Sequence, residues 1–494
     1  MKKPIWEPSP ERIERANINR FVRYVREQTG NEDMRRYAPL YDFSIRHPER
    51  FWSLVWEFCG IRASGTFHEV LVDADRLPGA RWFPGIRLNF AQNLLRFRDE
   101  RCALSGPSLE SGTQELSYAE LQQQVARLVA ALREQGLKPG DHVSAVLPNC
   151  CEAVIALLAA VALGATWSAC SDAADVAHIA ATLEGFSPQW IFTSSTGEAA
   201  VAAAQPQVRR IVIGAASGQA TAWSSLLAHE PAPLSYELAG FDHPLYALHH
   251  ADGTTSLHSA GGTLIQHLKE LVLHADLKRE DRVLFAAAPG EALWYWLVSA
   301  LAVGSTLVLA GADFAPAQDS SWDRVDEHAI TVIALTPAQI EAFCDGAANP
   351  RETHKLLSLK TVLAVGGQLD AERVAQVYAR LKDRLMLSTF CGHAGGLSFL
   401  ALGCPLLPVY AGEVQCRGLG MKIEVLDEAD QPLHHEQSGT LACLAPFPAL
   451  PLGLLGDADG SLFQQRYFTR RNAWCSGERG SMTEHEGVLL QTQG

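Results

Sequence analysis

Several features that mark other classes of protein are missing from this sequence of 494 residues. Its 11 cysteines are scattered and never spaced as CxxC, which argues against a disulfide framework or a zinc ribbon and suits a reducing compartment. Basic residues are in deficit, because 41 Lys and Arg against 55 Asp and Glu give a net charge of −14, and such a surface repels nucleic acid. The longest apolar run, residues 153–167, is shorter than the roughly 20 residues that span a bilayer, and the N-terminus has no apolar stretch of the kind found in secretory signals. We therefore expect a cytoplasmic protein with neither a membrane nor a nucleic acid as its partner.

What is present is the composition of a large globular protein, with 47% hydrophobic and 19% charged residues and a length that requires more than one core. Apolar residues recur at helical spacing between 121 and 132, and this helix ends before Gly136. Beyond it, short apolar runs alternate with helical windows, which is typical of doubly wound parallel sheets. Strands are predicted at 143–147, near 166, and at 190–193, 210–213, 283–287, 306–309, 332–335, 361–365 and 385–390. Helices are predicted at 263–275, 293–302, 337–344 and 370–382.

Two other regions differ from this alternation. Residues 195–240 are rich in Ala, Gln, Ser and Pro and are interpreted as a shortened linker. After Gly418 the pattern changes to short strands and turns, at 422–426, 440–445 and 488–491, which predicts a small β-rich subdomain.

Ordered blocks along the chain resemble one enzyme family. The segments RWFPGIRLNFAQNLL (81–95), YDFSIRHPERFWSLVWEFCGI (41–61) and LPVYAGEVQCRGLGMKIEVLDE (407–428) follow the adenylate-forming, AMP-binding acyl-CoA synthetases, and are most similar to acetoacetyl-CoA synthetases. The resemblance implies an N-terminal extension at 1–100, an AMP-binding core of two α/β subdomains at 101–418, and a β-rich subdomain at 419–494 that ends at the family's hinge. It implies an α/β fold of two doubly wound, mainly parallel sheets. We expect no C-terminal lid domain in this chain.

The family reaction joins an acid to ATP as an acyl-adenylate and then to CoA, so ATP or AMP, Mg²⁺ and CoA are implied by resemblance only. The family's phosphate loop, roughly Y-[ST]-S-G-T-T-G-x-P-K, corresponds here to ALHHADGTTSLHSA at 247–260. Its Pro-Lys end is absent, and Asp252 adds a negative charge that would repel a triphosphate. The remnant expected to touch a nucleotide is Gly253, Thr254, Thr255 and Ser256.

Three other nucleotide-binding segments of the family have counterparts. Gly366 and Gly367 correspond to the loop that packs on adenine, although a strand followed by Gly-Gly and a helix is common in α/β sheets. Gly392 is the second residue of CGHAGG (391–396), where the family has Gly-Gly-Thr followed by an acid that helps to hold magnesium, and that acid is replaced by Gly395. Glu478 stands where the family has the aspartate that binds ribose.

The acyl pocket of the family corresponds to the helix that carries Trp294 and Trp296, and these are the predicted substrate-pocket residues. Before them Gly290-Glu291 replaces a Gly-Trp pair, and a buried acid there would discourage a carboxylate substrate. The alternative interpretation is that both tryptophans simply pack the core.

These losses lead to two hypotheses. The first is a protein with lost or strongly impaired adenylation, with no catalytic residues and no metal site, that acts in binding or regulation. Its partner would be a small acyl or nucleotide ligand, or a protein such as an active synthetase, an acyl carrier or a separate lid domain. The second is an active acetoacetate or short-chain acyl-CoA ligase with a lid supplied by another chain.

Overall fold

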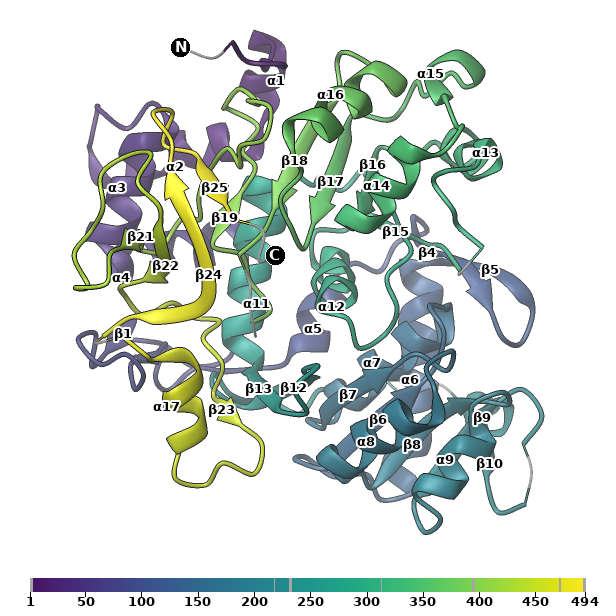
Figure 1. The fold of residues 1–494 in the computed structure, drawn as a ribbon. Helices are drawn as coiled ribbons and strands as arrows, with labels where there is room; N and C mark the ends of the chain where they lie inside the picture. The colour runs from purple at the N-terminus through teal and green to yellow at the C-terminus, as the bar shows by residue number, and fades with distance from the viewer. Residues whose placement is uncertain are drawn as a thin grey trace.

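The computed structural model describes residues 3–216, 218–230, 233–311, 313–392, 396–470 and 472–491. Two large sheets and a smaller sheet form the body, and the N-terminal helices pack beside the smaller sheet (Figure 1). The layered arrangement of parallel strands and helices confirms the predicted α/β class.

The first large sheet has eight strands in the order β10-β9-β8-β6-β7-β12-β13-β23. Neighbours from β10 to β12 are parallel, whereas β12, β13 and β23 pair antiparallel. Its strands are β6 (His142–Val146), β7 (Thr166–Cys170), β8 (Trp190–Ser194), β9 (Arg209–Ile213), β10 (Thr221–Ala222), β12 (Pro244–His249), β13 (Thr255–Ser259) and β23 (Gly453–Leu454). The helices of this region are α6 (Tyr118–Glu134), α7 (Cys151–Ala162), α8 (Val176–Phe186), α9 (Glu198–Ala204) and α10 (Trp223–Leu227).

The second large sheet has seven strands in the order β18-β17-β16-β14-β15-β4-β5, and every pair but β4–β5 is parallel. Its strands are β4 (Cys102–Ser108), β5 (Gly112–Ser117), β14 (Arg282–Phe285), β15 (Thr306–Leu309), β16 (Val332–Leu335), β17 (Thr361–Val365) and β18 (Met386–Phe390). Its helices are α12 (Ala292–Val298), the 3-10 helix η2 (Ser299–Ala302), α13 (Asp319–Glu327), α14 (Pro337–Asp345), α15 (Pro350–Thr353) and α16 (Ala371–Arg380).

The C-terminal part of the chain forms a four-stranded antiparallel sheet, β21 (Ile423–Leu426), β22 (Gly439–Cys443), β24 (Trp474–Met482) and β25 (Val488–Leu490), with helix α17 (Ser461–Tyr467) beside it. The β-rich pattern predicted after Gly418 is thus observed. However, β23 from the same part of the chain pairs with β13, so it belongs to the eight-stranded sheet. A separate antiparallel pair is formed by β19 (Ala401–Leu402) and β20 (Cys416–Arg417).

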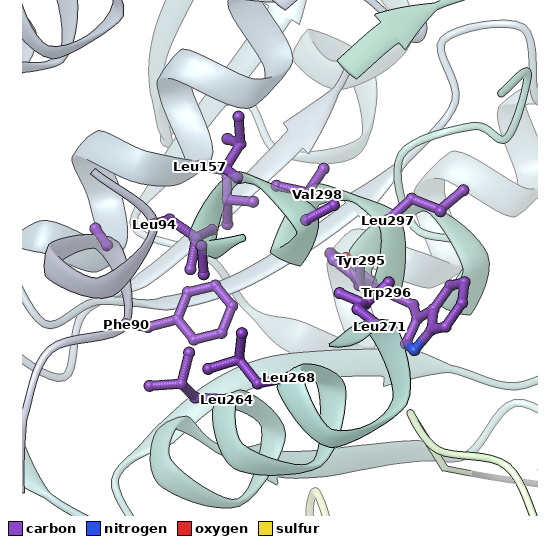
Figure 2. Close-up of a cluster of buried hydrophobic side chains, with 14 of the residues drawn as sticks. Phe90, Leu94, Leu157, Leu264, Leu268, Leu271, Tyr295, Trp296, Leu297 and Val298 are labelled. Atoms are coloured by element: carbon purple, nitrogen blue, oxygen red, sulfur yellow. The ribbon is translucent and has the colours of Figure 1, made fainter. Parts of the chain in front are cut away.

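The N-terminal extension consists of α1 (Pro10–Arg15), α2 (Asn17–Thr29), α3 (Tyr37–Arg46), α4 (Pro48–Cys59) and α5 (Phe90–Leu94), with short strands β1 (Leu71–Val72), β2 (Arg81–Trp82) and β3 (Arg87–Leu88), the last paired with β11 (Ala239–Gly240). Its aromatic residues are the reason that it docks: Phe51 and Trp52 of α4 are fully buried. Phe90 and Leu94 of α5 are also buried and lie beside Leu264 on α11 (Ala260–Leu268), as Figure 2 shows.

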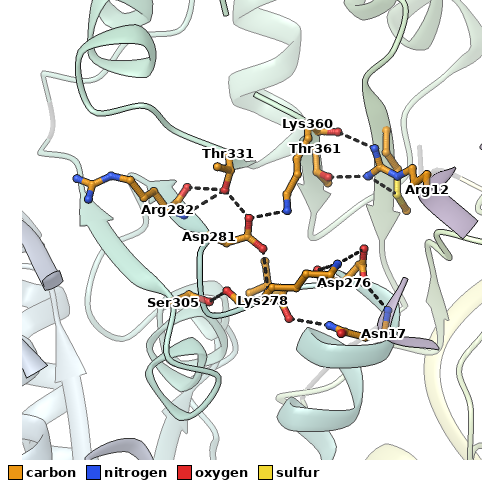
Figure 3. Close-up of polar contacts among 12 residues, drawn as sticks. Arg12, Asn17, Asp276, Lys278, Asp281, Arg282, Ser305, Thr331, Lys360 and Thr361 are labelled. Carbon is orange, nitrogen blue, oxygen red and sulfur yellow. Dashed lines mark hydrogen bonds and ion pairs between the residues drawn. The ribbon is translucent and has the colours of Figure 1, made fainter. Parts of the chain in front are cut away.

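A polar network fixes the first helices to the amino-terminal edge of the seven-stranded sheet (Figure 3). Buried Asp281 pairs with Lys360 Nζ at 2.6 Å and accepts from Thr331 Oγ1 at 2.7 Å. Arg12 of α1 donates to the Lys360 carbonyl at 3.2 Å and to Thr361 Oγ1 at 3.0 Å. These contacts lie at the edge opposite the carboxyl ends of the strands.

One sequence interpretation was wrong. Residues 195–240 are not a plain linker, because they contain α9, β9, β10 and α10, and β9 is an inner strand of the eight-stranded sheet. The alanine-rich composition that suggested a linker also suits a short helix packed on a sheet. Within the described residues, no helix combines the length and the apolar character that crossing a membrane requires.

Candidate functional site

A cleft of about 510 Å³ opens where the carboxyl ends of strands from both large sheets meet. Ligands of doubly wound sheets bind at this edge. The described lining residues are Ala169, Cys170, Ser171, Ala174, His178, Thr182, Leu248, His249, His250, Ala251, Ala288, Pro289, Gly290, Glu291, Ala292, Leu293, Thr336, Val365, Gly366 and Gly396. Of these, Glu291 is the only Asp, Glu, Lys or Arg.

The turn between β12 and β13, which replaces the phosphate loop, is tight and closed on itself. His250 N donates to Thr254 O at 2.9 Å, and Gly253 N donates to His250 O at 3.0 Å. Asp252 Oδ1 accepts from Thr254 N at 3.1 Å and from Thr254 Oγ1 at 2.7 Å. The backbone and hydroxyl donors of Thr254 are therefore directed at Asp252, within the turn.

A long-range ion pair holds this turn. Arg466 of α17 pairs with Asp252 and also donates to Thr254 Oγ1 at 3.0 Å. We call Asp252, Thr254 and Arg466 the hairpin clamp. It corrects one expectation, because the charge of Asp252 is compensated by Arg466 rather than left to repel a ligand.

Two further hydroxyl groups of the hairpin, those of Thr255 and Ser256, form hydrogen bonds with histidines. His249 lies between Ser168 Oγ, 2.7 Å from its Nε2, and Thr255 Oγ1, 2.9 Å from its Nδ1. Burial lowers the pKa of His249 to about 4, so the ring is neutral at pH 7. Ser256 Oγ is 2.9 Å from the Nε2 atoms of both His250 and His258. Burial lowers the pKa of His258 to about 3.

The predicted phosphate residues Gly253, Thr254, Thr255 and Ser256 are consequently brought together, but they are not in the cleft lining, where the same hairpin contributes His249, His250 and Ala251. Sequence reasoning missed His249 as a lining residue. The signal that could have found it is its position at the carboxyl end of a strand of the first sheet.

Gly366 is where the sequence placed it, in the cleft wall at the end of β17. Its φ of +109° is a conformation that favours glycine, and its N–H donates to Phe390 O at 2.9 Å. Gly367 lies outside the lining, and a Cβ there would come 3.1 Å from Pro337 Cγ. Thr336, which sequence reasoning missed, lines the cleft and caps α14 by accepting from Gln339 N at 3.2 Å.

Gly392 and Glu478 lie next to each other. A Cβ on Gly392, whose φ is +81°, would come 3.1 Å from Glu478 Oε2. Burial, followed by the nearby Glu478 carboxylate, raises the pKa of Cys391. The structure thus brings together two residues 86 positions apart in the sequence (478 − 392 = 86), although neither belongs to the described lining. Gly395, which stands in place of the family's acid, falls outside the described residues.

Trp294 and Trp296, the predicted substrate-pocket residues, do not belong to the described cleft lining. Both are buried in the core, where Trp294 Nε1 donates to Asn149 Oδ1 at 3.0 Å and Trp296 Nε1 donates to Glu270 Oε2 at 2.9 Å. Figure 2 shows Trp296 within a cluster of buried hydrophobic side chains. The first turn of α12 instead presents Leu293 to the cleft, with Glu291 just before the helix. The alternative interpretation, core packing, describes these tryptophans.

The sequence had suggested that Glu291 is buried, but in the structure it is exposed and lines the cleft. Its Oε1 accepts from Ala288 N at 3.2 Å, and the surrounding protein raises the pKa of the carboxyl by desolvation. The preceding Gly290 has φ +98°, and a Cβ there would come 2.3 Å from Ala169 O, so glycine is required for this approach.

The described residues do not fit a magnesium-bound triphosphate. The cleft lining that they form supplies neither Lys nor Arg to bind the phosphates. It does contain one carboxylate, that of Glu291. In the parts of the chain that the structure describes, no three His, Cys, Asp or Glu side chains gather as a metal site. The electrostatic repulsion between a carboxylate and one phosphate charge about 6 Å away would be about 3 kcal/mol at an effective dielectric constant of about 20.

Comparisons with known proteins agree on one family. A family model described as AMP-binding enzyme matches residues 90–447, and one described as acetyl-coenzyme A synthetase N-terminus matches residues 37–94. The acetoacetyl-coenzyme A synthetase of Rhizobium meliloti is 32% identical over 99% of this chain and 79% of its own length. The acetoacetyl-CoA synthetase of Danio rerio is 32% identical over 99% of this chain and 77% of its own. The structure of acetoacetyl-CoA synthetase from Streptomyces lividans superimposes with a TM-score of 0.92 at 30% identity, covering 99% of this chain and 80% of that one.

Proposed function

Because the chain belongs to the acetoacetyl-CoA synthetase-like family of AMP-binding enzymes, we propose that it keeps the family's cleft as a small-molecule site and has lost, or strongly impaired, the ATP-dependent adenylation step. The hairpin clamp is the observation that carries this proposal. The turn that would have to receive phosphate oxygens uses the donors of Thr254 on Asp252, and Arg466, which contacts the turn, is already paired with Asp252.

The charge distribution supports the same conclusion. A triphosphate is stabilised by several preorganised cations or donors, and each one removed from such a site costs about 2.7–4 kcal/mol of transition-state stabilisation. The described cleft lining offers Glu291 and neutral groups such as His249 in their place. Opening the clamp to free Thr254 would in addition break an ion pair.

The test is ATP–pyrophosphate exchange with the full chain and a panel of short acids that includes acetoacetate. The Streptomyces lividans acetoacetyl-CoA synthetase, assayed in parallel, is the positive control. We expect exchange at background with every acid. Exchange above background that disappears in Glu478→Ala would overturn the proposal.

A second candidate function, an active acetoacetate or short-chain acyl-CoA ligase, is favoured by one observation. Glu478 keeps a carboxylate beside the Gly392 loop, where a nucleoside could be bound. Calorimetry with AMP tests this candidate, because the ligase requires that Glu478→Ala weaken AMP binding, and unchanged binding would contradict it. The same protein with Glu49→Gln, an exposed change in the N-terminal extension, is the matched control.

A further inference from the structure

Among the Asp, Glu, Lys and Arg residues of the chain that the structure describes, Glu291 alone lines the cleft. Glu291 is exposed to the cleft, and within the described part of the chain it forms no ion pair with Lys, Arg or His. Within the same described residues, the one hydrogen bond of its carboxylate is the donation from Ala288 N to Oε1 at 3.2 Å. One oxygen of this cleft-lining carboxylate is thereby oriented by the backbone.

The position of this carboxylate is fixed by the chain before it. Gly290 approaches the backbone at Ala169 so closely that a Cβ would come within 2.3 Å of its oxygen. Glu291 then directly precedes α12, whose residues from Leu293 to Val298 are buried in the core. A carboxylate held between a close backbone contact and a buried helix is preorganised for a partner.

The described lining around it holds no further Asp or Glu and neither Lys nor Arg. Leu293, Val365, Pro289 and Cys170 provide apolar surface. His249 has both ring nitrogens occupied by Ser168 and Thr255, and its pKa of about 4 keeps it uncharged at pH 7. A volume of about 510 Å³ lies within the usual range for a small-molecule site.

We propose that this cleft binds a small organic cation, a primary ammonium group carried on an apolar body, with Glu291 as its counter-ion. The inference rests on the proposed function, in that the cleft is taken to be a small-molecule site. An ammonium would supply the charge that the protein itself does not offer to Glu291, and the net charge of −14 attracts cations to the molecule. An anionic ligand of the same shape would meet the uncompensated carboxylate instead.

The test compares three six-carbon probes that differ in charge: hexylammonium, hexanoate and hexanol, titrated into the full chain and followed by ligand-observed NMR at pH 7.5. We expect hexylammonium to bind at least tenfold more tightly than hexanoate. Glu291→Gln should weaken hexylammonium at least tenfold and narrow its difference from hexanoate, whereas Glu49→Gln should change neither.

Equal or tighter binding of hexanoate would overturn the inference, and so would an unchanged affinity for hexylammonium in Glu291→Gln. Equal binding of hexanol would also overturn it, because shape alone would then explain the affinity. Circular dichroism and the melting temperature of Glu291→Gln show whether the variant is folded, which we expect for an exposed residue. The exchange assay is read separately: exchange with preserved amine selectivity contradicts only the proposed function, and background exchange without amine selectivity contradicts only this inference.

Discussion

A buried ion pair behind the cleft allows a sharp prediction about stability. After α11 the helix continues as a π-helix, η1 (Lys269–His274), and its first two residues, Lys269 and Glu270, have side chains with no exposed surface. Their Nζ and Oε1 atoms are 3.3 Å apart. Glu270 also accepts from Trp296 Nε1 at 2.9 Å and from Gln266 Nε2 at 3.0 Å. The perturbation is to remove each charge in turn, as Glu270→Gln and Lys269→Met.

The two changes should have unequal costs. Glu270→Gln leaves the ammonium of Lys269 buried without a counter-ion, and breaking a buried pair in this way costs about 3–5 kcal/mol. Lys269→Met leaves a carboxylate that still accepts from Trp296 and Gln266, so about 1–3 kcal/mol is expected, within the range of an imperfectly satisfied buried polar group. Desolvation lowers the pKa of Lys269, which shows that burial already opposes this charge. The double variant should cost no more than Lys269→Met alone.

Thermal unfolding measures the difference. An unfolding entropy of about 2.1 cal/mol/K per residue gives roughly 1 kcal/mol/K for a chain of this length, so Glu270→Gln should lower the Tm by about 4 °C and Lys269→Met by about 2 °C. The reasoning is refuted if Lys269→Met lowers the Tm as much as Glu270→Gln. It is equally refuted if the two effects add in the double variant, since the pair would then not be coupled.

Three further predictions concern pH, the hairpin clamp and the cleft wall. Burial lowers the pKa of His258 and of His267 to about 3, so between pH 6.5 and 3 each binds its proton in the unfolded chain but not in the folded chain. The free energy of unfolding should therefore fall as the pH drops through this window, by about 2 kcal/mol per histidine at pH 5. His267→Gln should make the free energy of unfolding, measured by urea titration at each pH, depend less steeply on pH. Arg466→Gln removes a partly exposed ion pair and should cost only about 0.5–1 kcal/mol, yet amide exchange at Gly253 should speed up at least fivefold; unchanged exchange would mean that the pair does not hold the turn. Gly290→Ala combines a φ of +98° with a Cβ 2.3 Å from a backbone oxygen and should destabilise the fold by about 2–4 kcal/mol in urea unfolding, whereas a neutral result would show that the segment relaxes.

The parallel sheets were the part most readily predicted from sequence. The bounds predicted for β15, β16 and β17 are the observed ones, because inner parallel strands are buried on both faces and appear as short continuous apolar runs. The hairpin strands β12 and β13 were not predicted. They carry His, Ser and Thr, whose burial depends on partners such as Ser168 and not on an apolar pattern.

The candidate site was predicted only where a local signal exists. Gly366 could be placed because a glycine after a strand marks the carboxyl edge of the sheet. The pairing of Asp252 with Arg466 spans 214 residues, and no local pattern reports such a contact. Trp294 and Trp296 were assigned to the pocket although they are core residues, because α12 is buried all round from Leu293 onward and its sequence has no polar face to show which side meets the cleft.

The pairing of β23 with β13 has a mechanical consequence. Leu452 N bonds to Leu257 O and Leu455 N to Thr255 O, both at 2.8 Å, so the β-rich part of the chain is joined edge to edge with the sheet that forms one cleft wall. Sliding or hinging of one part against the other would have to rupture this short ladder before the entrance could widen. Adaptation to ligands of different bulk should therefore come from side-chain rotation and from the connecting loops. The β-rich part of the chain and the eight-stranded sheet should move as a single unit.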